Sequence, residues 1–247
     1  MLSEGRKVTR PEMLKKLPPL EQPIAVRLKF VKTGNMQYIS HLDLQRTFNR
    51  ILVRSGLPVW YTKGFNPHAK LVFSTPLSVG TQSECEFLDI RLDREMPCEQ
   101  IKEMLNAEMT DEMYITDVYI PESKFANIAF CEYRYEIFTS GADASLSEKI
   151  CELFSTSPLT LVKRTKSGER KVDIIPLIKA FGCKFDAAEG VLRINATLCA
   201  QTENFLNPEM LITAMKTNLG ILSGDPAQEW YSIVRVNSMT EDMTPFK

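Results

Sequence analysis

The 247-residue sequence lacks the features that define membrane and secreted proteins. No apolar run approaches the ~18 residues that a membrane-spanning helix requires. Residues 1–22 contain no apolar stretch of the kind found in secretory signals. None of the six cysteines belongs to a C-x-x-C pair, and five lie among apolar or strand-forming residues, where a free cysteine acts as a small hydrophobic side chain. We therefore expect a cytoplasmic, reducing location, no contact with membranes and no iron–sulfur cluster in this chain.

Common catalytic and nucleotide-binding motifs are missing as well. The sequence has no Walker loop, no G-x-G-x-x-G, no G-x-S-x-G and no H-E-x-x-H. It has only two histidines, His41 and His68, and no H-x-x-x-H spacing, which leaves a sparse set of metal ligands. We predict no cofactor and no metal site in this chain. Whether the chain is an enzyme stays open, and an accessory role is the favoured interpretation.

Charge is distributed unevenly, although the formal net charge is only −1. Residues 1–80 contain 13 Lys and Arg against 4 Asp and Glu, whereas residues 81–160 contain 6 against 17. This separation favours one face that attracts an anion such as RNA and another that attracts a basic partner. The alternative is that the opposite charges meet within the fold and cancel, since surface pairs are common and individually weak.

Hydrophobic periodicity predicts a first α+β unit at residues 23–121, preceded by a flexible basic arm at 1–22. Its best-defined helix has Ser40 as N-cap, Asp43 three residues later, and Gly56 followed by Pro58 as the stop signal. The expected order is strand 24–33, helix 40–55, strand 58–62, a strand region 71–92 interrupted at 76–80, helix 97–109 and strand 113–120.

A second unit at residues 131–240 repeats this order without repeating the residues. Residues 121–131 would link the two units. The order fits the ferredoxin-like βαββαβ motif, so we predict two tandem ferredoxin-like units with antiparallel sheets and a basic hairpin insertion in the second. The expected elements are strand 132–139, helix 145–156, a strand pair at 159–173, a short helix 176–181, strand 190–199, helix 208–219 and strand 229–237.

Several short motifs within residues 38–92 are specific. They are S-H-L-D-x-x-R at 40–46, G-L-P at 56–58, Y-x-x-G-F-N-P-H at 61–68, P-L-x-x-G at 76–80 and E-x-x-D at 86–89. This set resembles the radical-SAM-linked protein family, bacterial proteins of unknown function that occur alone or as C-terminal extensions of radical SAM proteins. The resemblance implies a radical SAM protein as partner, which would carry the iron–sulfur cluster and S-adenosylmethionine, and it implies work on RNA.

Both histidines fall inside these motifs. If residues 58–62 form the second strand of a ferredoxin-like unit, the 63–70 loop returns to the edge where the first helix begins, so His41 and His68 would share a cleft with Lys63 or Asn66. A helix N-terminus offers free N–H groups and a positive dipole end, which favours an anion. The histidines could instead act as acid and base in RNA cleavage, bind a metal, or simply cap and stack.

The same helix and loop carry the residues expected to bind RNA. Arginines spaced along one helical face could follow a phosphodiester backbone, and aromatic residues of the loop could stack on unpaired bases. The alternative for the arginines is an ordinary solvated face. The predicted binding residues here are Asp43, Arg46, Arg50, Arg54, Tyr61, Lys63, Gly64, Phe65, Asn66 and Lys70.

Two further segments are charged. The predicted hairpin around Ser167-Gly168 carries Lys166, Arg170 and Lys171, which could enter folded RNA or could only protect an exposed ribbon from aggregation. The acidic residues of 84–95 include Glu86 and Asp89 of the E-x-x-D motif; we expect them to form a docking surface or to pair internally with Arg27 or Arg91.

Three functions are consistent with these patterns. The favoured one is an accessory RNA-binding or substrate-presenting protein that works with a radical SAM enzyme in RNA modification, without reading DNA sequence. A self-contained RNA-processing or RNA-modifying enzyme using His41 and His68 is the second; the doubled unit is similar in order to CRISPR repeat-processing endoribonucleases. The third is a protein–protein scaffold that docks through its acidic middle segment.

Overall fold

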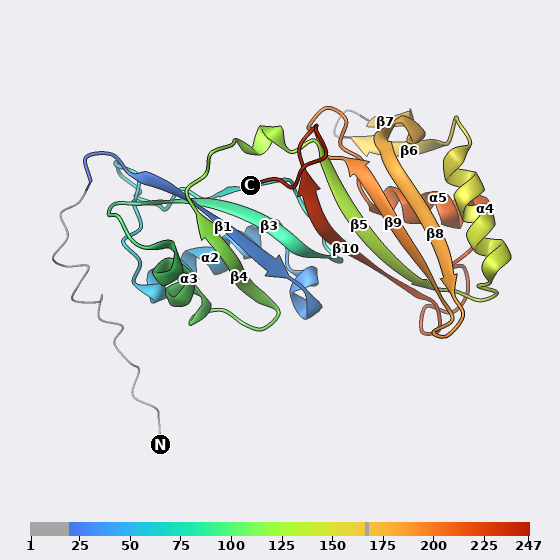
Figure 1. The fold of residues 1–247 in the computed structure, drawn as a ribbon, viewed down its shortest axis with the longest axis horizontal. Coiled ribbons are helices and arrows are strands. Elements are labelled where there is room, and N and C mark those ends of the chain that lie inside the picture. Colours follow the sequence, from blue (N-terminus) through green and yellow to red (C-terminus); the bar gives the residue numbers. More distant parts are fainter. Residues whose placement is uncertain (1–19, 166–167) are drawn as a thin grey trace, which may run out of the picture. The chain divides into compact units, whose positions relative to one another are not determined.

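The computed structural model describes residues 20–165 and 168–247, which divide into two compact units (Figure 1). Unit 1 comprises the described residues up to Val79, residues Ser83–Lys124 and Lys247; unit 2 comprises Gly80–Gln82 and Phe125–Phe246. The described residues form mixed α+β structure with antiparallel strands and four α-helices, so the predicted fold class is confirmed at this level. None of these helices is both long and apolar enough to cross a membrane. The predicted basic arm at 1–22 lies outside the described residues except for its last three.

Unit 1 contains three long strands and one very short strand, which pair antiparallel in the order β4-β1-β3-β2. β3 runs over Thr81–Leu92, and its residues from Ser83 onward belong to this unit. The other elements, in chain order, are β1 (Ile24–Lys32), the 3₁₀ turn η1 (Gly34–Tyr38), α2 (His41–Ser55), β2 (Val72–Phe73), α3 (Cys98–Asn106) and β4 (Met113–Tyr119).

The helix α2 begins and ends where its sequence predicts. The Ser40 side chain accepts a hydrogen bond from the backbone N–H of Asp43, and Gly56 takes the left-handed conformation, φ 70°, that closes many helices. Its apolar face packs on β1, β3 and α3 and forms the core of the unit. The helical residues buried in this core are Leu44, Phe48, Ile51 and Leu52 of α2, with Ile101 and Leu105 of α3.

Unit 2 has a four-stranded antiparallel sheet in the order β10-β5-β9-β8 and a separate ribbon of β6 with β7. The aromatic rings of Phe154 in α4 and Phe181 in β8 lie 4.3 Å apart and join helix to sheet. The elements are η2 (Phe125–Asn127), β5 (Phe130–Phe138), α4 (Ala144–Ser155), β6 (Thr160–Thr165), β7 (Gly168–Asp173), η3 (Ile175–Leu177), β8 (Ile178–Asp186), β9 (Val191–Cys199), α5 (Glu209–Leu219) and β10 (Trp230–Met239).

Two predicted elements are wrong. Residues 58–62 do not form a strand: Val59 and Tyr61 make only isolated bridges, and β2 takes the place expected for the second strand. Residues 176–181 form the end of η3 and the start of β8 rather than a helix, since Phe181, Cys183 and Phe185 alternate toward the helix-covered face and pair with β9. The predicted domain limits at 23–121 and 131–240 stay a prediction.

Candidate functional site

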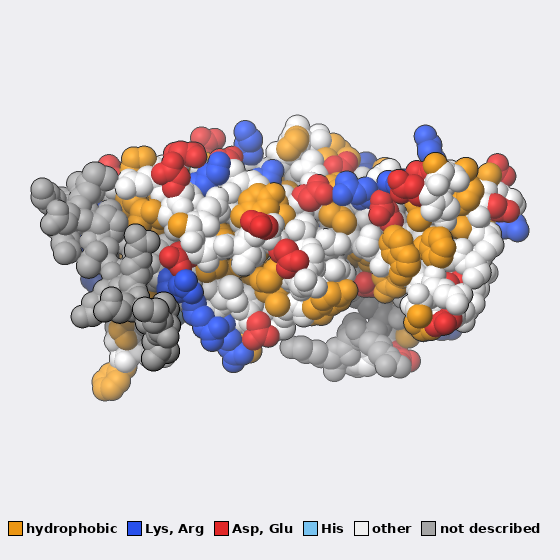
Figure 2. Space-filling view, turned by 90° about the horizontal axis from the view of Figure 1, so that it is seen from below, with side chains coloured by type: hydrophobic (Ala, Val, Ile, Leu, Met, Phe, Trp, Pro, Cys, Tyr) orange, Lys and Arg blue, Asp and Glu red, His pale blue; other side chains and the backbone are white. Residues whose placement is uncertain are grey.

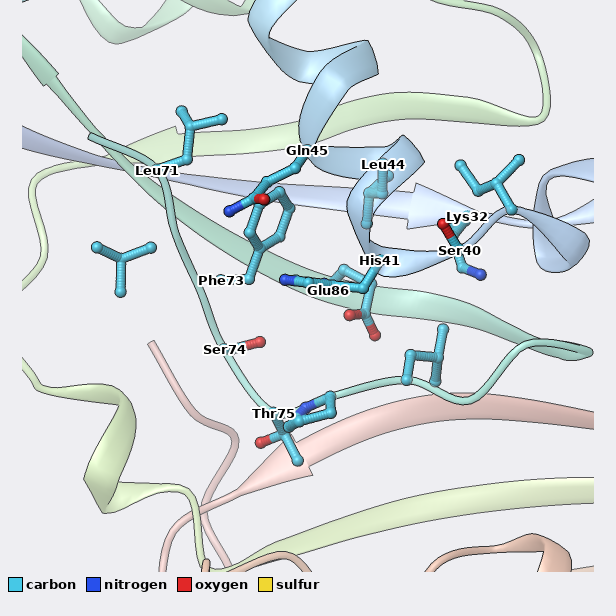
Figure 3. A pocket seen from close by; sticks show the side chains of 14 residues that line it. Lys32, Ser40, His41, Leu44, Gln45, Leu71, Phe73, Ser74, Thr75 and Glu86 are labelled. Atoms are coloured by element: carbon cyan, nitrogen blue, oxygen red, sulfur yellow. The ribbon is translucent and has the colours of Figure 1, made fainter. Parts of the chain in front are cut away.

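A solvent-open pocket of about 490 Å³ lies in unit 1 beside the first turn of α2 (Figure 3). It forms where the end of β1, the start of α2 and the segment that follows β2 come together. We call it the His41 pocket. Half of its lining is apolar, from Ile39, Leu44, Leu71, Val72, Phe73, Pro76 and Leu77. The other half is polar, from Lys32, Ser40, His41, Gln45, Ser74, Thr75 and Glu86.

Two charged side chains of this lining are buried. Lys32 is 3% exposed and its ammonium donates to the backbone carbonyls of Met36 and Gln37, each at 3.4 Å. Glu86 is 5% exposed and stands opposite Phe30 in the β1–β3 register, so its side chain points to the helix-covered face. In Figure 3 its carboxylate lies between the start of α2 and the Ser74–Thr75 segment. A buried acid and a buried base thus line one small pocket.

A cluster of aromatic rings in edge-to-face contact forms the wall beside His41. The exposed imidazole of His41 meets the ring of Phe73 edge to face, with centroids 5.0 Å apart. Phe73 in turn packs against Phe48 at 5.8 Å and Phe30 at 6.5 Å. The position of the imidazole is therefore connected to the core of the unit through edge-to-face ring contacts.

The first turn of α2 carries a small polar network at the pocket rim. The Ser40 hydroxyl donates to Asp43 Oδ2 at 2.7 Å, and Arg46 Nη1 donates to Asp43 Oδ1 at 3.1 Å. The hydrogen bond from Ser40, with the one from Arg46, holds the pKa of Asp43 below its ordinary value. Asp43 therefore stays ionised and serves the helix cap.

The loop histidine has a different environment. His68 Nδ1 lies 3.0 Å from the backbone carbonyl oxygen of Asn66 and 3.2 Å from Thr62 Oγ1, and the backbone N–H of His68 donates to Thr62 Oγ1. Because a carbonyl oxygen only accepts, Nδ1 carries the proton in its contact with Asn66. The imidazole thus closes the 62–68 turn while remaining exposed.

The prediction of a cleft shared by His41 and His68 is wrong. His68, Lys63 and Asn66 are not among the residues that line the His41 pocket. The reason is topological: the loop precedes β2 instead of following the second strand. Val59, just before the loop, bridges to Leu92 at the far end of β3, whereas Glu86 of the pocket lies six residues earlier in that strand.

The 61–70 loop presents a mixed aromatic and basic surface. Phe65 is fully exposed, at 111% of its reference area, and Tyr61 is 42% exposed. Lys63 and Lys70 are exposed beside them, as is Asn66. Gly64 has φ 132°, a conformation that side-chain-bearing residues rarely adopt, and it lets the loop turn before Phe65.

The predicted arginine face of α2 is exposed, and two of its members form ion pairs. Arg46 contacts Asp43 as expected, and Arg54 Nε lies 2.7 Å from Glu108 Oε2, which follows α3. Arg50 is exposed between them. Figure 2 shows Lys and Arg side chains gathered in a short run in the part of unit 1 that carries α2 and α3. The exposed pair of Arg46 with Asp43 is weak enough to exchange for a phosphate contact, whereas the side chain of Glu108 is only 19% exposed.

The predicted hairpin exists as the β6–β7 ribbon, in which Lys163 pairs with Arg170 in register. Arg170 and Lys171 are exposed. Lys166 lies outside the described residues. The Asp173 carboxylate closes the base of the ribbon by accepting hydrogen bonds from the backbone of Leu159 and Ile175, so it serves a turn rather than chemistry.

Internal pairing accounts for much of the acidic segment. Asp89 accepts two hydrogen bonds from Arg27, at 2.7 and 2.9 Å, and Arg27 is 1% exposed and also donates to the Ser123 carbonyl oxygen. Asp93 pairs with Arg94, and Glu86 is buried in the pocket. The acidic docking surface therefore loses its two motif residues, Glu86 and Asp89.

A protein-family model matches residues 25–208, described as an uncharacterized protein conserved in bacteria (DUF2344). The chain belongs to this family. The matched region of this DUF2344 chain contains every residue of the His41 pocket, the 61–70 loop and the β6–β7 ribbon. A comparison with curated proteins gives no match.

Solved structures align over most of the DUF2344 chain but with little similarity. They include a DypB variant in complex with manganese (10% identity, 89% of this chain and 94% of that chain, TM-score 0.19). DyPB from Rhodococcus jostii RHA1 is 9% identical, with 88% of this chain and 94% of that chain covered and a TM-score of 0.20. A heme complex of a DypB variant from the same organism is 10% identical, with 89% of this chain and 94% of that chain covered and a TM-score of 0.20. TM-scores this low support no inference about fold or function.

Sequence patterns did not identify several residues of the pocket. Lys32 ends β1 and belongs to no recognised motif, and Phe73 and Ser74 lie between two recognised motifs. The E-x-x-D motif did contain Glu86, and the P-L-x-x-G motif follows Thr75 directly. Within the described residues, no group of three His, Cys, Asp or Glu side chains is arranged to hold a metal ion.

Proposed function

We propose that this protein binds single-stranded RNA through unit 1 and presents it to a radical SAM enzyme as an accessory partner. The observation that carries the RNA part is the 61–70 loop, where a fully exposed phenylalanine projects among exposed lysines. Exposed aromatic rings stack on unpaired bases of any sequence, and flanking cations attract the backbone. Such a surface binds RNA without reading DNA sequence.

The arginine face of α2 extends this surface. Arg46, Arg50 and Arg54 are exposed along the helix that precedes the loop. The pair of Arg46 with Asp43 costs little to break, because both side chains are exposed and such pairs contribute only ~0–1 kcal/mol, whereas Arg54 is held by a carboxylate that is only 19% exposed. A backbone phosphate could replace the Asp43 carboxylate, as counterion release would favour. The β6–β7 ribbon, with Arg170 and Lys171, offers a second cationic element in unit 2.

The partnership with a radical SAM enzyme rests on the sequence motifs of residues 40–89, which resemble the radical-SAM-linked family. That enzyme would supply the iron–sulfur cluster and S-adenosylmethionine. We also infer that both units are ferredoxin-like. The order βαββαβ with the pairing β4-β1-β3-β2 supports this in unit 1, and the pairing β10-β5-β9-β8, with β6–β7 inserted after α4, supports it in unit 2.

The rival functions receive less support from the geometry. An acid–base pair of His41 and His68 needs both imidazoles at one substrate, and the His41 pocket contains only the first. A scaffold that docks through the acidic segment would need Glu86 and Asp89 at the surface, but one is buried and the other is bound to Arg27.

Anaerobic purification of the tagged protein from cells, after ultraviolet crosslinking, tests the proposal. We expect enriched RNA fragments crosslinked near Tyr61 and Phe65, together with a radical SAM protein. The matched control is Phe65→Ala with Lys63→Ala and Lys70→Ala, which should lose the RNA while the protein remains folded. Recovery of neither RNA nor a radical SAM protein would contradict the proposal; recovery of RNA alone would remove the partnership.

A further inference from the structure

We propose that a small pocket on the strands of unit 1 binds a phosphate group of the RNA backbone. The inference rests on the proposed RNA-binding function and names an anion site within that surface. The pocket has a volume of about 130 Å³. Its lining comes from three strands and from the last residue of the 61–70 loop: Ala25, Lys70, Val72, Asp89, Ile90 and Arg91. We call it the Arg91 pocket.

The Arg91 pocket lies on the face of the sheet opposite the helices. Ile90 of β3 belongs to the core under α2 and α3, so the alternate residues Asp89 and Arg91 point to the other face. Val72 of β2 stands opposite Asp89, and Ala25 of β1 stands opposite Arg91. The pairing of three strands therefore fixes the place of Arg91 in the pocket.

Two cations of the lining are available to a ligand. Lys70 is exposed and Arg91 is half-buried. Within residues 20–165 and 168–247, neither side chain has an ion pair or a hydrogen bond, and Arg91 contacts the ring of Trp60 instead. Asp89 is already neutralised, because both of its carboxylate oxygens accept hydrogen bonds from Arg27, at 2.7 and 2.9 Å. The pocket therefore has an excess of positive charge, which attracts an anion.

Trp60 orients the guanidinium of Arg91. The guanidinium carbon lies 5.6 Å from the centroid of the Trp60 ring, and the backbone N–H of Trp60 donates to the carbonyl oxygen of Arg91 at 2.9 Å. Stacking on an aromatic face leaves the N–H donors at the edge of a guanidinium free, and their fork geometry matches the oxygens of a phosphate. Arg91 is thus oriented before an anion arrives.

The size of the pocket limits the ligand to a small group. Pockets for drug-sized molecules measure ~300–1,000 Å³, so a pocket of about 130 Å³ suits one phosphate rather than a whole nucleoside. The bridge between Tyr61 and Ala69 closes the base of the loop and returns Lys70 to the Trp60 side. Surfaces that bind single strands combine aromatic rings for the bases with cations for the backbone. The exposed ring of Phe65 and this pocket match that combination.

Tryptophan fluorescence of the full chain tests the site directly. The chain has two tryptophans, so Trp230→Phe leaves Trp60 as the reporter. A phosphate that binds Arg91 changes the environment of the cation above the Trp60 ring. The probes are dimethyl phosphate, which has the single charge of a backbone diester, and inorganic phosphate. Sodium chloride at equal ionic strength is the control.

We expect a saturable change of the Trp60 signal with dimethyl phosphate that chloride does not produce. Lys70→Met, at an exposed position, retains the contact of Arg91 with Trp60 and should weaken this binding at least fivefold. Lys149→Met removes the same charge from an exposed position in α4 and should leave the binding unchanged.

Binding of single-stranded RNA gives a second measurement. Arg91→Met should lower the logarithmic salt slope by about 0.7, the value for one phosphate contact, whereas Lys149→Met should not change it. If Arg91→Met fails to fold, the fluorescence of Lys70→Met decides.

No saturable signal with dimethyl phosphate, an equal response to chloride, or unchanged binding in Lys70→Met would overturn the phosphate site. Binding of inorganic phosphate but not of dimethyl phosphate would overturn the assignment to an RNA backbone, because it indicates a free phosphate as ligand. Salt-dependent RNA binding with a pocket that ignores dimethyl phosphate leaves the RNA function standing and removes the site. Binding of dimethyl phosphate at Arg91 without RNA binding keeps the site and removes the RNA function.

Discussion

The imidazole of His41 and the ring of Phe73 meet edge to face, with 5.0 Å between centroids and 76° between planes. One residue begins a helix and the other ends a two-residue strand, so this contact joins the first turn of α2 to β2. Phe73 continues the contact into the core through Phe48. The relationship places an exposed titratable side chain on a rigid wall, at the mouth of a pocket that contains Glu86 and Lys32.

His41→Ala should affect binding more than folding. The imidazole is exposed and its ring contact is worth about 0.5–1.5 kcal/mol at most, so the free energy of unfolding should fall by roughly 1 kcal/mol or less. Urea denaturation and RNA binding measured on the same sample check this. A decrease of several kcal/mol, with RNA affinity unchanged per folded molecule, would show that His41 is structural.

Arg27→Met should destabilise unit 1 strongly. Arg27 is 1% exposed and donates to both carboxylate oxygens of Asp89, so its removal leaves a largely buried carboxylate without its partner, at a cost of about 3–5 kcal/mol. Arg46→Met is the matched control: it breaks an exposed pair with Asp43 and should cost less than about 1 kcal/mol. Equal losses in urea denaturation would contradict the structure of this ion pair.

Unit 2 should lose stability in acid through Glu229. Hydrogen bonds from the Ser140 and Gly224 backbones and the Thr139 hydroxyl lower the pKa of this half-buried carboxyl to about 2, the Ser140 bond contributing most. Because the folded pKa lies below the ordinary value of 4.5, the stabilisation is present above pH 4.5 and is lost as the pH falls toward 2. Carboxyl NMR titration measures the pKa directly.

Glu229→Gln should remove this part of the acid dependence, while Glu241→Gln, at an exposed position of unit 2, should leave it unchanged. Thermal denaturation between pH 5 and pH 2 compares the three proteins. An ordinary titration of Glu229 near pH 4.5, or parallel curves for the wild type and Glu229→Gln, would show that the carboxylate does not hold the 139–140 and 224 turns together.

Local sequence signals predicted most of the elements because the fold follows them. Ser40 and Gly56 delimit α2, and the alternation in 130–138 and 191–199 produces β5 and β9. The errors occurred where two signals competed. Pro176 looked like a helix start, yet the alternation of Phe181, Cys183 and Phe185 and the pairing with β9 decide for a strand. The short strand β2 is fixed by its register with β3, which no local pattern encodes.

The site could be predicted only in part, for the same reason. The motifs directed attention to His41 and Glu86, but their proximity depends on where the chain returns to the sheet after α2. Assigning the second strand to 58–62 instead of Val72–Phe73 moved the 63–70 loop to the wrong end. The expected internal pairing of the E-x-x-D motif with Arg27 is confirmed at Asp89, whereas Lys32 belongs to no recognised motif and is buried because β1 is covered on both faces.

Phe65→Ala should weaken RNA binding without changing its salt dependence. Stacking on an aromatic ring contributes about 1–3 kcal/mol per base and involves no counterion release. Phe65 is fully exposed, so the substitution should leave the free energy of unfolding unchanged within about 0.5 kcal/mol. Tyr38→Ala, 65% exposed but outside the loop, is the control. Fluorescence anisotropy with labelled single-stranded RNA measures the affinity of each variant. Equally weakened binding of Phe65→Ala and Tyr38→Ala would show that Phe65 has no special role.

The central claim, that the basic surface binds RNA, is tested most directly by the dependence of this affinity on salt concentration. The affinity for single-stranded RNA should fall steeply with salt. Each phosphate contact that Arg50→Ala, Arg54→Ala, Lys166→Ala or Arg170→Ala removes should reduce the logarithmic slope by about 0.7. Absence of binding at low salt, or an affinity that does not change with salt, would contradict the account.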